Sequence, residues 1–158
     1  LEDFRVLNET KTKGMVRSFV MDAVQTATSY TPLGDSVKYF SLYQKRETDW
    51  IWQSYGLQPV EGFARGSWRV SFDNSSQLQE YYGRNSDELA LRAANTSIRG
   101  YQVGQTIMIS NYGPYILDLD KNNSSPQTQG QGILKPTIDS VMRIAGAALK
   151  NYYDRTTA

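Results

Sequence analysis

The side chains that most enzymes use for nucleophilic or acid–base chemistry are missing from this sequence, because its 158 residues include no His and no Cys. A Ser–His–Asp or Cys–His nucleophile, a His-ligated zinc ion and an imidazole base are therefore excluded. The glycine motifs that bind phosphate, the P-loop and GxGxxG, do not occur either. We therefore predict that the protein is not an enzyme and uses no cofactor.

The best candidate for a metal site is the stretch "DLDKNN", which begins at Asp118. Asp118, Asp120 and Asn122 occupy the first, third and fifth positions of a calcium-binding loop. The twelfth position, however, is Gln129 rather than a bidentate Glu, and the sixth is Asn123 rather than Gly. A solvated turn is therefore the better interpretation. Asp118 and Asp120 are not favoured as an acid–base pair either, because no neighbouring residues indicate a pocket.

A second candidate site is the aromatic group formed by Trp50, Trp52 and Tyr55. These side chains could stack on a sugar, which would make the protein a monomeric ligand-binding module. They could also belong to the protein's own core, or anchor a protein interface, where Trp and Tyr are enriched. We favour an interface with another subunit or partner and keep the other two uses as alternatives.

Charge and length limit the remaining function classes. The 17 basic and 16 acidic residues give a net charge of +1, and no run of Lys or Arg forms a patch for nucleic acid. No stretch approaches the roughly 18 apolar residues that would span a bilayer, so we predict no membrane partner. The length fits a single domain over residues 1–158.

Three helices are predicted from apolar periodicity and capping residues. The first covers residues 12–30 and ends before Pro32; its apolar face consists of Val16, Phe19, Val20, Ala23, Ala27 and Tyr30. The second runs from Ser86 to about Arg99, and its inward residues are predicted to be Leu89, Ala93 and Thr96 or Ser97. The third has Pro136 in its first turn; its core-facing stripe is predicted to be Ile138, Val141, Met142, Ala145, Ala148, Leu149 and Tyr152.

Two segments alternate between apolar and polar residues, as half-buried strands do. In residues 66–73, Trp68, Val70 and Phe72 share one face, and in residues 105–111, Ile107 and Ile109 share one face. Residues 112–119 begin with a Gly-Pro turn and are predicted to continue extended. The predicted fold class is α+β: a small, mostly antiparallel sheet packed by long N- and C-terminal helices, with an inserted extended arm.

The inserted arm, about residues 33–61, and a polar loop, about residues 120–132, have no evident place in this fold. Long polar loops within a small domain usually have a function, and exposed aromatic side chains indicate a surface that is buried against a partner. We therefore predict interface residues in both segments. In the arm they are Tyr39, Phe40, Tyr43, Trp50, Trp52 and Tyr55, and around the loop they are Asp118, Asp120, Asn122 and Gln129.

Four segments in order carry a resemblance to a known family: "SYTP", "GFARGSWRVSF", "VGQTIMISNYGPYILDL" and "GILKPTIDSVMRIA". Together they resemble the neck, or head–tail joining and tail-completion, family of tailed bacteriophages. The likeness covers residues 12–32 and 62–150. The residues that fit the family pattern are Gly62, Arg65, Gly66, Ser67, Trp68, Ile109, Ser110, Asn111, Pro114, Tyr115, Leu119 and Gly132. Asp120 departs from it, because the family pattern has Glu there, and so does Asn122, where the pattern has Gly.

The resemblance implies a structural virion protein that forms a ring in the phage neck, found in the virion and, during assembly, in the host cytoplasm. Its partners would be copies of itself, in a ring expected to be a hexamer, and the connector (portal) and tail proteins on either side. DNA would pass through the ring transiently. A tail-terminator ring at the end of the tail tube is the alternative. Closed rings of one chain use heterologous contacts, in which unlike patches meet, and the arm and the loop could supply them.

Overall fold

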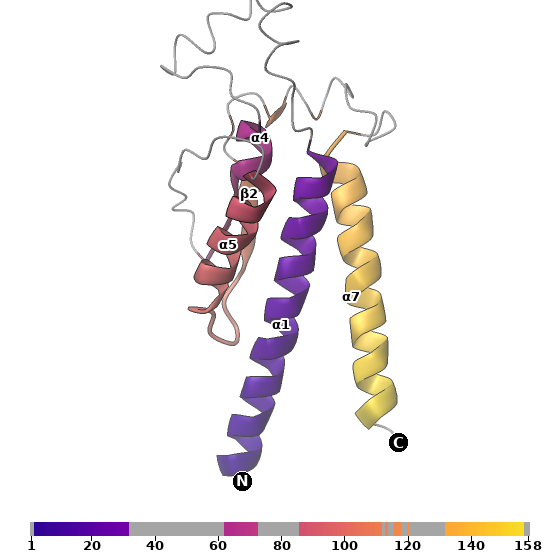
Figure 1. The fold of residues 1–158 in the computed structure, drawn as a ribbon. Coiled ribbons are helices and arrows are strands. Elements are labelled where there is room, and N and C mark those ends of the chain that lie inside the picture. The colour runs from indigo at the N-terminus through magenta and orange to yellow at the C-terminus, as the bar shows by residue number, and fades with distance from the viewer. Residues whose placement is uncertain are drawn as a thin grey trace, which may run out of the picture.

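A computed structural model describes residues 2–31, 62–72, 86–111, 113, 116–117, 120 and 132–156. In chain order, the elements of these residues are α1 (Glu2–Tyr30), α4 (Phe63–Gly66), β1 (Trp68–Ser71), α5 (Ser86–Ile98), β2 (Met108–Asn111) and α7 (Leu134–Thr156) (Figure 1). Four helices and a two-stranded antiparallel sheet make the fold α+β, which confirms the predicted class. The arm of residues 33–61 lies outside the described residues, as does nearly all of the loop of residues 120–132.

The first helix is longer than its sequence pattern predicted, since α1 begins at Glu2 rather than at residue 12. The prediction began where apolar residues start to recur, and the first turns of α1 lack that period. The helix ends as expected before Pro32, and the Thr31 amide donates to the carbonyl oxygens of Ala27 and Thr28 at 3.1 and 3.2 Å. The predicted inner face is confirmed: Val20, Ala23 and Ala27 are buried, and Val16, Phe19 and Tyr30 are partly buried against the core.

The second helix, α5, has its predicted bounds but not its predicted inner face. The buried residues are Ser86, Ala90, Ala94 and Ile98, whereas Leu89 and Ala93 are only half-buried. The prediction took the large Leu89 as the inward residue, but the helix instead turns a stripe with small Ala90 and Ala94 at its centre toward the core. A hydrogen bond also joins α5 to α1: the Arg17 guanidinium of α1 donates to the Asn95 side-chain oxygen of α5 at 2.6 Å.

Strand β1 confirms the predicted alternation over a shorter length, whereas all four residues of β2 are half-buried, so β2 does not show the predicted alternation. Trp68 lies opposite Asn111 and Ser71 opposite Met108, in antiparallel register. Trp68 and Val70 are buried, while Arg69 and Ser71 are half-buried. Two local predictions are wrong. Gly66 belongs to the helical turn α4 rather than to the strand, and the Ile116 amide donates to the Gly113 carbonyl at 3.0 Å, which turns residues 116–117 into helix where an extended chain was predicted.

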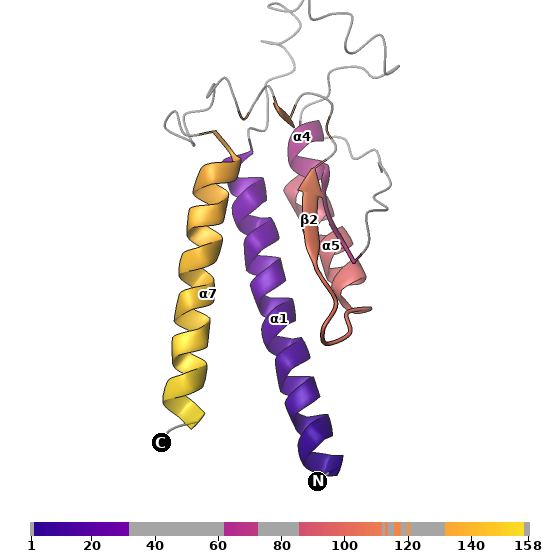
Figure 2. The ribbon, with the colours of Figure 1, turned by 180° about the vertical axis from the view of Figure 1, so that it is seen from behind.

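Helix α1 lies in the middle of the molecule, with the sheet and α5 on one side and α7 on the other (Figures 1 and 2). The buried core takes residues from α1, β1 and α5, together with Tyr101 and with Ile133 just before α7; it consists of Val20, Val24, Ala27, Trp68, Val70, Ala90, Ala94, Ile98, Tyr101 and Ile133. Helices α1 and α7 lie side by side where α1 ends and α7 begins. From there they diverge toward the two chain termini, which are at the same end of the molecule (Figures 1 and 2).

Candidate assembly site

The two ends of the arm are fastened to each other by hydrogen bonds. Thr31 is the last described residue before the arm, and the chain is described again from Gly62. The Arg65 Nε donates to the Thr31 carbonyl oxygen at 2.8 Å, and the Trp68 indole Nε1 donates to the Thr31 Oγ1 at 2.8 Å. Thr31 Oγ1 in turn donates to the Ala27 carbonyl at 2.7 Å. The arm therefore begins and ends at one buried point of the folded domain.

We call Thr31, Arg65 and Trp68 the arm base; Arg69 lies beside it, one residue after Trp68. Arg65 and Arg69 suggest solvated or carboxylate-paired side chains from their sequence positions. In the structure Arg65 instead binds the Thr31 carbonyl. The Arg69 Nη1 donates to the carbonyls of Gly66 and Trp68, each at 2.6 Å, and the pairing of Arg69 with a carboxylate stays a prediction. The Arg69 guanidinium thus satisfies carbonyl oxygens at the end of α4, and the Arg65 guanidinium satisfies the carbonyl oxygen just after α1.

Asn111 extends the arm base to the last strand. Its side-chain Nδ2 donates to the Ala64 carbonyl of α4 at 2.7 Å, and its Oδ1 accepts from the Gly113 amide at 2.9 Å. One amide group therefore joins α4, the end of β2 and the turn that follows it. This accounts in physical terms for Asn in the "ISN" motif, since the site requires a donor and an acceptor on one short side chain.

Asp120 is the one predicted interface residue that the structure describes, and it caps α7. Its Oδ1 accepts from the amides of Ile133 and Leu134 at 2.7 and 2.8 Å, at the first residues of the helix. A carboxylate at this helix end both satisfies free amides and suits the helix dipole. Within the described ranges, no group of three or more His, Cys, Asp or Glu is placed to hold a metal ion.

The other predicted interface residues lie outside the described residues, so their role stays a prediction. They are Tyr39, Phe40, Tyr43, Trp50, Trp52 and Tyr55 in the arm, and Asp118, Asn122 and Gln129 around the loop. Hydrogen bonds join the described residues on both sides of the arm to the end of β2, through Arg65 to Thr31 and through Asn111 to Ala64.

Helix α7 presents an exposed apolar surface that was predicted to be core. Leu134, Ile138 and Met142, one turn apart from each other, have exposed fractions of 44%, 56% and 67%; we call these three residues the α7 stripe. The helix instead turns Thr137 and Ser140 inward, and Val141 and Ala145 are half-buried. The prediction for Ile138 and Met142 is therefore wrong, because the apolar face of α7 is wider than the surface that α1 covers.

A second exposed apolar surface lies at the start of α1. Every residue from 2 to 10 is exposed, and we call this segment the α1 tip. Phe4 and Leu7, on one face of the helix, have exposed fractions of 68% and 51%. Just beyond the tip, Lys13 joins α1 to the segment that follows α5, because its Nζ donates to the Gln102 Oε1 at 3.0 Å. Sequence reasoning missed both surfaces, although the residues at 4, 6 and 7 offered an apolar signal.

The comparisons with known proteins add no family. No protein-family model matches the chain, and neither the curated proteins nor the solved structures gave a match. None of the helices in the described part of the chain is long and apolar enough to cross a membrane.

The arm base leads to a prediction about the arm itself. Replacing residues 36–58 with a short Gly/Ser linker is expected to leave a folded, soluble domain that no longer assembles, because Thr31, Arg65 and Trp68 already hold the two ends together. Circular dichroism with thermal melting checks the fold, and light scattering checks assembly. As a control, Ser at Trp50, Trp52 and Tyr55 in an arm of natural length is expected to cause the same loss. Unfolding of the linker variant would show that the arm belongs to the core.

Proposed function

We propose that this protein is a structural subunit of a tailed-phage virion, which assembles as a ring in the neck and joins the capsid connector to the tail. The observation that carries the proposal is the α7 stripe, a row of large apolar side chains that the described fold leaves in water. The resemblance in sequence supports the position in the neck. The ring would hold six copies, as the family resemblance implies, and would let DNA pass.

An exposed apolar row of this kind favours an association role. Removal of apolar surface from water is favourable by about 25 cal/mol per Å², and contiguous apolar patches larger than a few hundred Å² on a soluble protein mark interaction surfaces. The residues that resemble the family pattern also have an architectural use here. Arg65, Trp68 and Asn111 hold the arm base, and Gly132 precedes the capped start of α7. Arg65, Trp68 and Asn111 therefore hold together the residues that flank the arm.

The proposal predicts that a charge on the α7 stripe abolishes the ring and leaves the fold intact. Ile138→Glu introduces a carboxylate at a position more than half exposed in the monomer, so the thermal midpoint is expected to stay within about 2 °C, as for most surface changes. In an interface the same carboxylate would be buried without a partner, which is costly. The measurement is electron microscopy of the protein assembled with connector and tail proteins, supplied by phage infection.

Gln25→Glu is the matched control, because it adds the same charge at an exposed position on another helix, α1. It is expected to assemble as the natural chain does. A reconstruction of the assembled particle that shows isolated copies, or purified virions without the protein, would contradict the proposed function. Ring assembly by Ile138→Glu would show that the α7 stripe is not a subunit contact.

A further inference from the structure

We infer that the α7 stripe of one subunit binds the α1 tip of the next copy of the chain. This inference rests on the proposed function, since it specifies which two surfaces meet when subunits join. A contact between unlike patches is heterologous, and repetition of a heterologous contact closes a ring when the rotation between subunits permits. The occupant of the α7 stripe is therefore a second copy of this protein.

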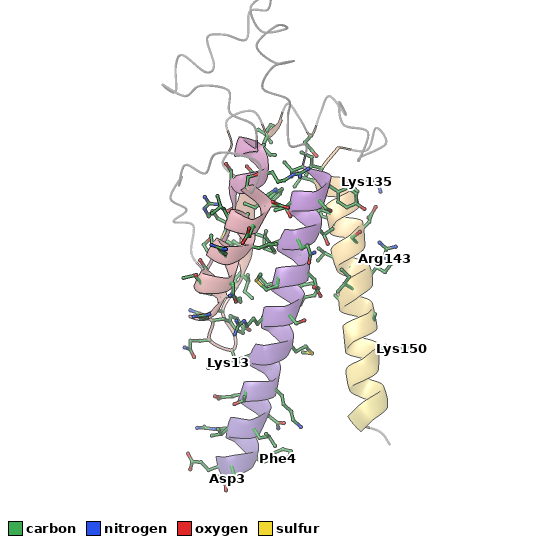
Figure 3. The ribbon with its side chains drawn as sticks, viewed as in Figure 1. Asp3, Phe4, Lys13, Lys135, Arg143 and Lys150 are labelled. Carbon is green, nitrogen blue, oxygen red and sulfur yellow. The ribbon has the colours of Figure 1, made fainter. Side chains whose placement is uncertain are left out.

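The two surfaces cannot serve each other within one subunit. Helices α1 and α7 diverge toward the chain termini, so the α1 tip lies away from the start of its own α7 (Figures 1 and 2). Figure 3 shows Phe4 near the free end of α1, well apart from Lys135 at the start of α7. Both surfaces are apolar, and both are exposed in the described part of the chain.

The two surfaces are similar in size and form. The α7 stripe, from Leu134 to Met142, extends about 12 Å along its helix at the α-helical rise. The α1 tip has the same length and carries Phe4 and Leu7 as a pair of large apolar groups on one face. Two helices that each present a row of this length can pack ridges into grooves, the general mode of helix contact.

Charge identifies the α1 tip as the partner of α7. The exposed charged side chains of α7 from residue 134 to 150 are Lys135, Asp139, Arg143 and Lys150, so three basic and one acidic give +2. Those of the exposed start of α1, residues 2 to 11, are Glu2, Asp3, Arg5, Glu9 and Lys11, so three acidic and two basic give −1. Opposite charge at the edges of two apolar surfaces favours their association and fixes which partner is accepted.

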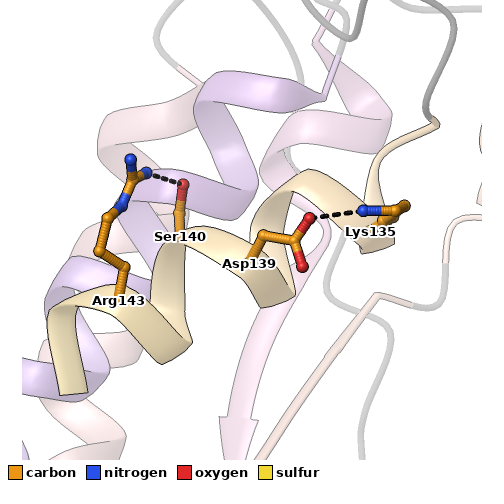
Figure 4. Close-up of polar contacts among 4 residues, drawn as sticks. All are labelled: Lys135, Asp139, Ser140 and Arg143. Atoms are coloured by element: carbon orange, nitrogen blue, oxygen red, sulfur yellow. Dashed lines mark hydrogen bonds and ion pairs between the residues drawn. The ribbon is translucent and has the colours of Figure 1, made fainter. Parts of the chain in front are cut away.

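The contacts on α7 leave its basic charge available to a partner. Lys135 pairs with Asp139 at 2.6 Å, whereas Arg143 donates to the Ser140 hydroxyl at 3.0 Å (Figure 4). Figure 3 places the Arg143 side chain on the side of α7 away from α1. If two α7 helices paired, basic side chains would face basic side chains. If two α1 tips paired, acidic side chains would face acidic side chains. Like charges therefore disfavour both symmetric alternatives.

The absence of cysteine permits a background-free cross-linking test. Asn8 follows Phe4 by one turn and Gly146 follows Met142 by one turn. Both are exposed, and a Cβ at Gly146 meets nothing within 4 Å. A chain with both Asn8→Cys and Gly146→Cys, treated with a short bismaleimide at high protein concentration, is expected to give a ladder of covalent oligomers. A mixture of the two single variants is expected to stop at the dimer, and Gln25→Cys paired with Gly146→Cys serves as the negative control.

Each result supports or overturns the inference. Dimers from Gly146→Cys alone would show that α7 meets α7, and dimers from Asn8→Cys alone would show that the tips meet; either overturns the pairing. A ring seen by electron microscopy without the ladder would reject the inference and leave the proposed function in place. Absence of both ladder and ring would reject both. The ladder together with the ring would support both.

Discussion

Replacing Trp68 with alanine is expected to lower the free energy of unfolding by about 3–5 kcal/mol, the usual cost of truncating a buried Trp or Phe. Trp68 is 3% exposed and belongs to the core shared by α1, the sheet and α5. It also closes the arm base through its bond to Thr31. Since a whole domain is stable by only about 5–15 kcal/mol, the variant is expected to be close to unfolding at room temperature.

Trp68→Phe separates the two contributions of this side chain. Phenylalanine keeps most of the apolar volume but leaves the Thr31 hydroxyl without its indole donor, so a smaller loss of about 1–2 kcal/mol is expected. Urea unfolding followed by circular dichroism measures both variants. If Trp68→Ala unfolds at the same urea concentration as the natural chain, Trp68 does not support the core and the assignment of strand faces is wrong.

The second large effect is expected at Gly132, where alanine should cost about 2–3 kcal/mol, from left-handed backbone strain and loss of a helix cap. Gly132 has φ +76°, and a Cβ there would lie 2.5 Å from the Asp120 carbonyl oxygen and 2.7 Å from its Oδ1. The same Oδ1 binds the amides of Ile133 and Leu134. An added methyl group therefore displaces the Asp120 carboxylate that caps the start of α7.

Gly104→Ala is the matched control for this prediction. Gly104 also has a positive φ, +95°, but a Cβ there would meet nothing within 4 Å. Its substitution is expected to cost only the backbone strain, about 1 kcal/mol. The difference between the two variants in chemical denaturation measures the contact between Gly132 and Asp120. Equal losses would show that this contact does not stabilise the protein.

The sequence predicted the elements whose signal is local. The inner face of α1 around Val20 and Ala27 follows from a helical period, and the buried alternation of Trp68 and Val70 follows from a strand period. The start of α1 was missed because its first turns have no such period. Period alone also placed Leu89 inward on α5, whereas the fold turned Ala90 to the core.

The features missed in the candidate site depend on contacts between distant residues. Asp120 caps a helix whose first amides are 13 and 14 residues further along the chain, so no local capping pattern announces it. Ile138 and Met142 are apolar at the right spacing for a core, and the sequence cannot state how much of that face α1 will cover. Hydrophobic patterning identifies a surface to be buried but not the molecule that buries it.

Helix α1 is supported along only part of its length and behaves as a cantilever. Residues 2–12 extend about 16 Å past Lys13, at the usual helical rise. A rotation of about 4° at Lys13 therefore displaces Glu2 by about 1 Å, within the gentle curvature that long helices commonly show. Contacts made at the far end of α1 can thus tolerate small differences in spacing elastically. The core around Trp68 keeps its geometry during such bending, so α1 is rigid where it packs against the core and flexible at its exposed start.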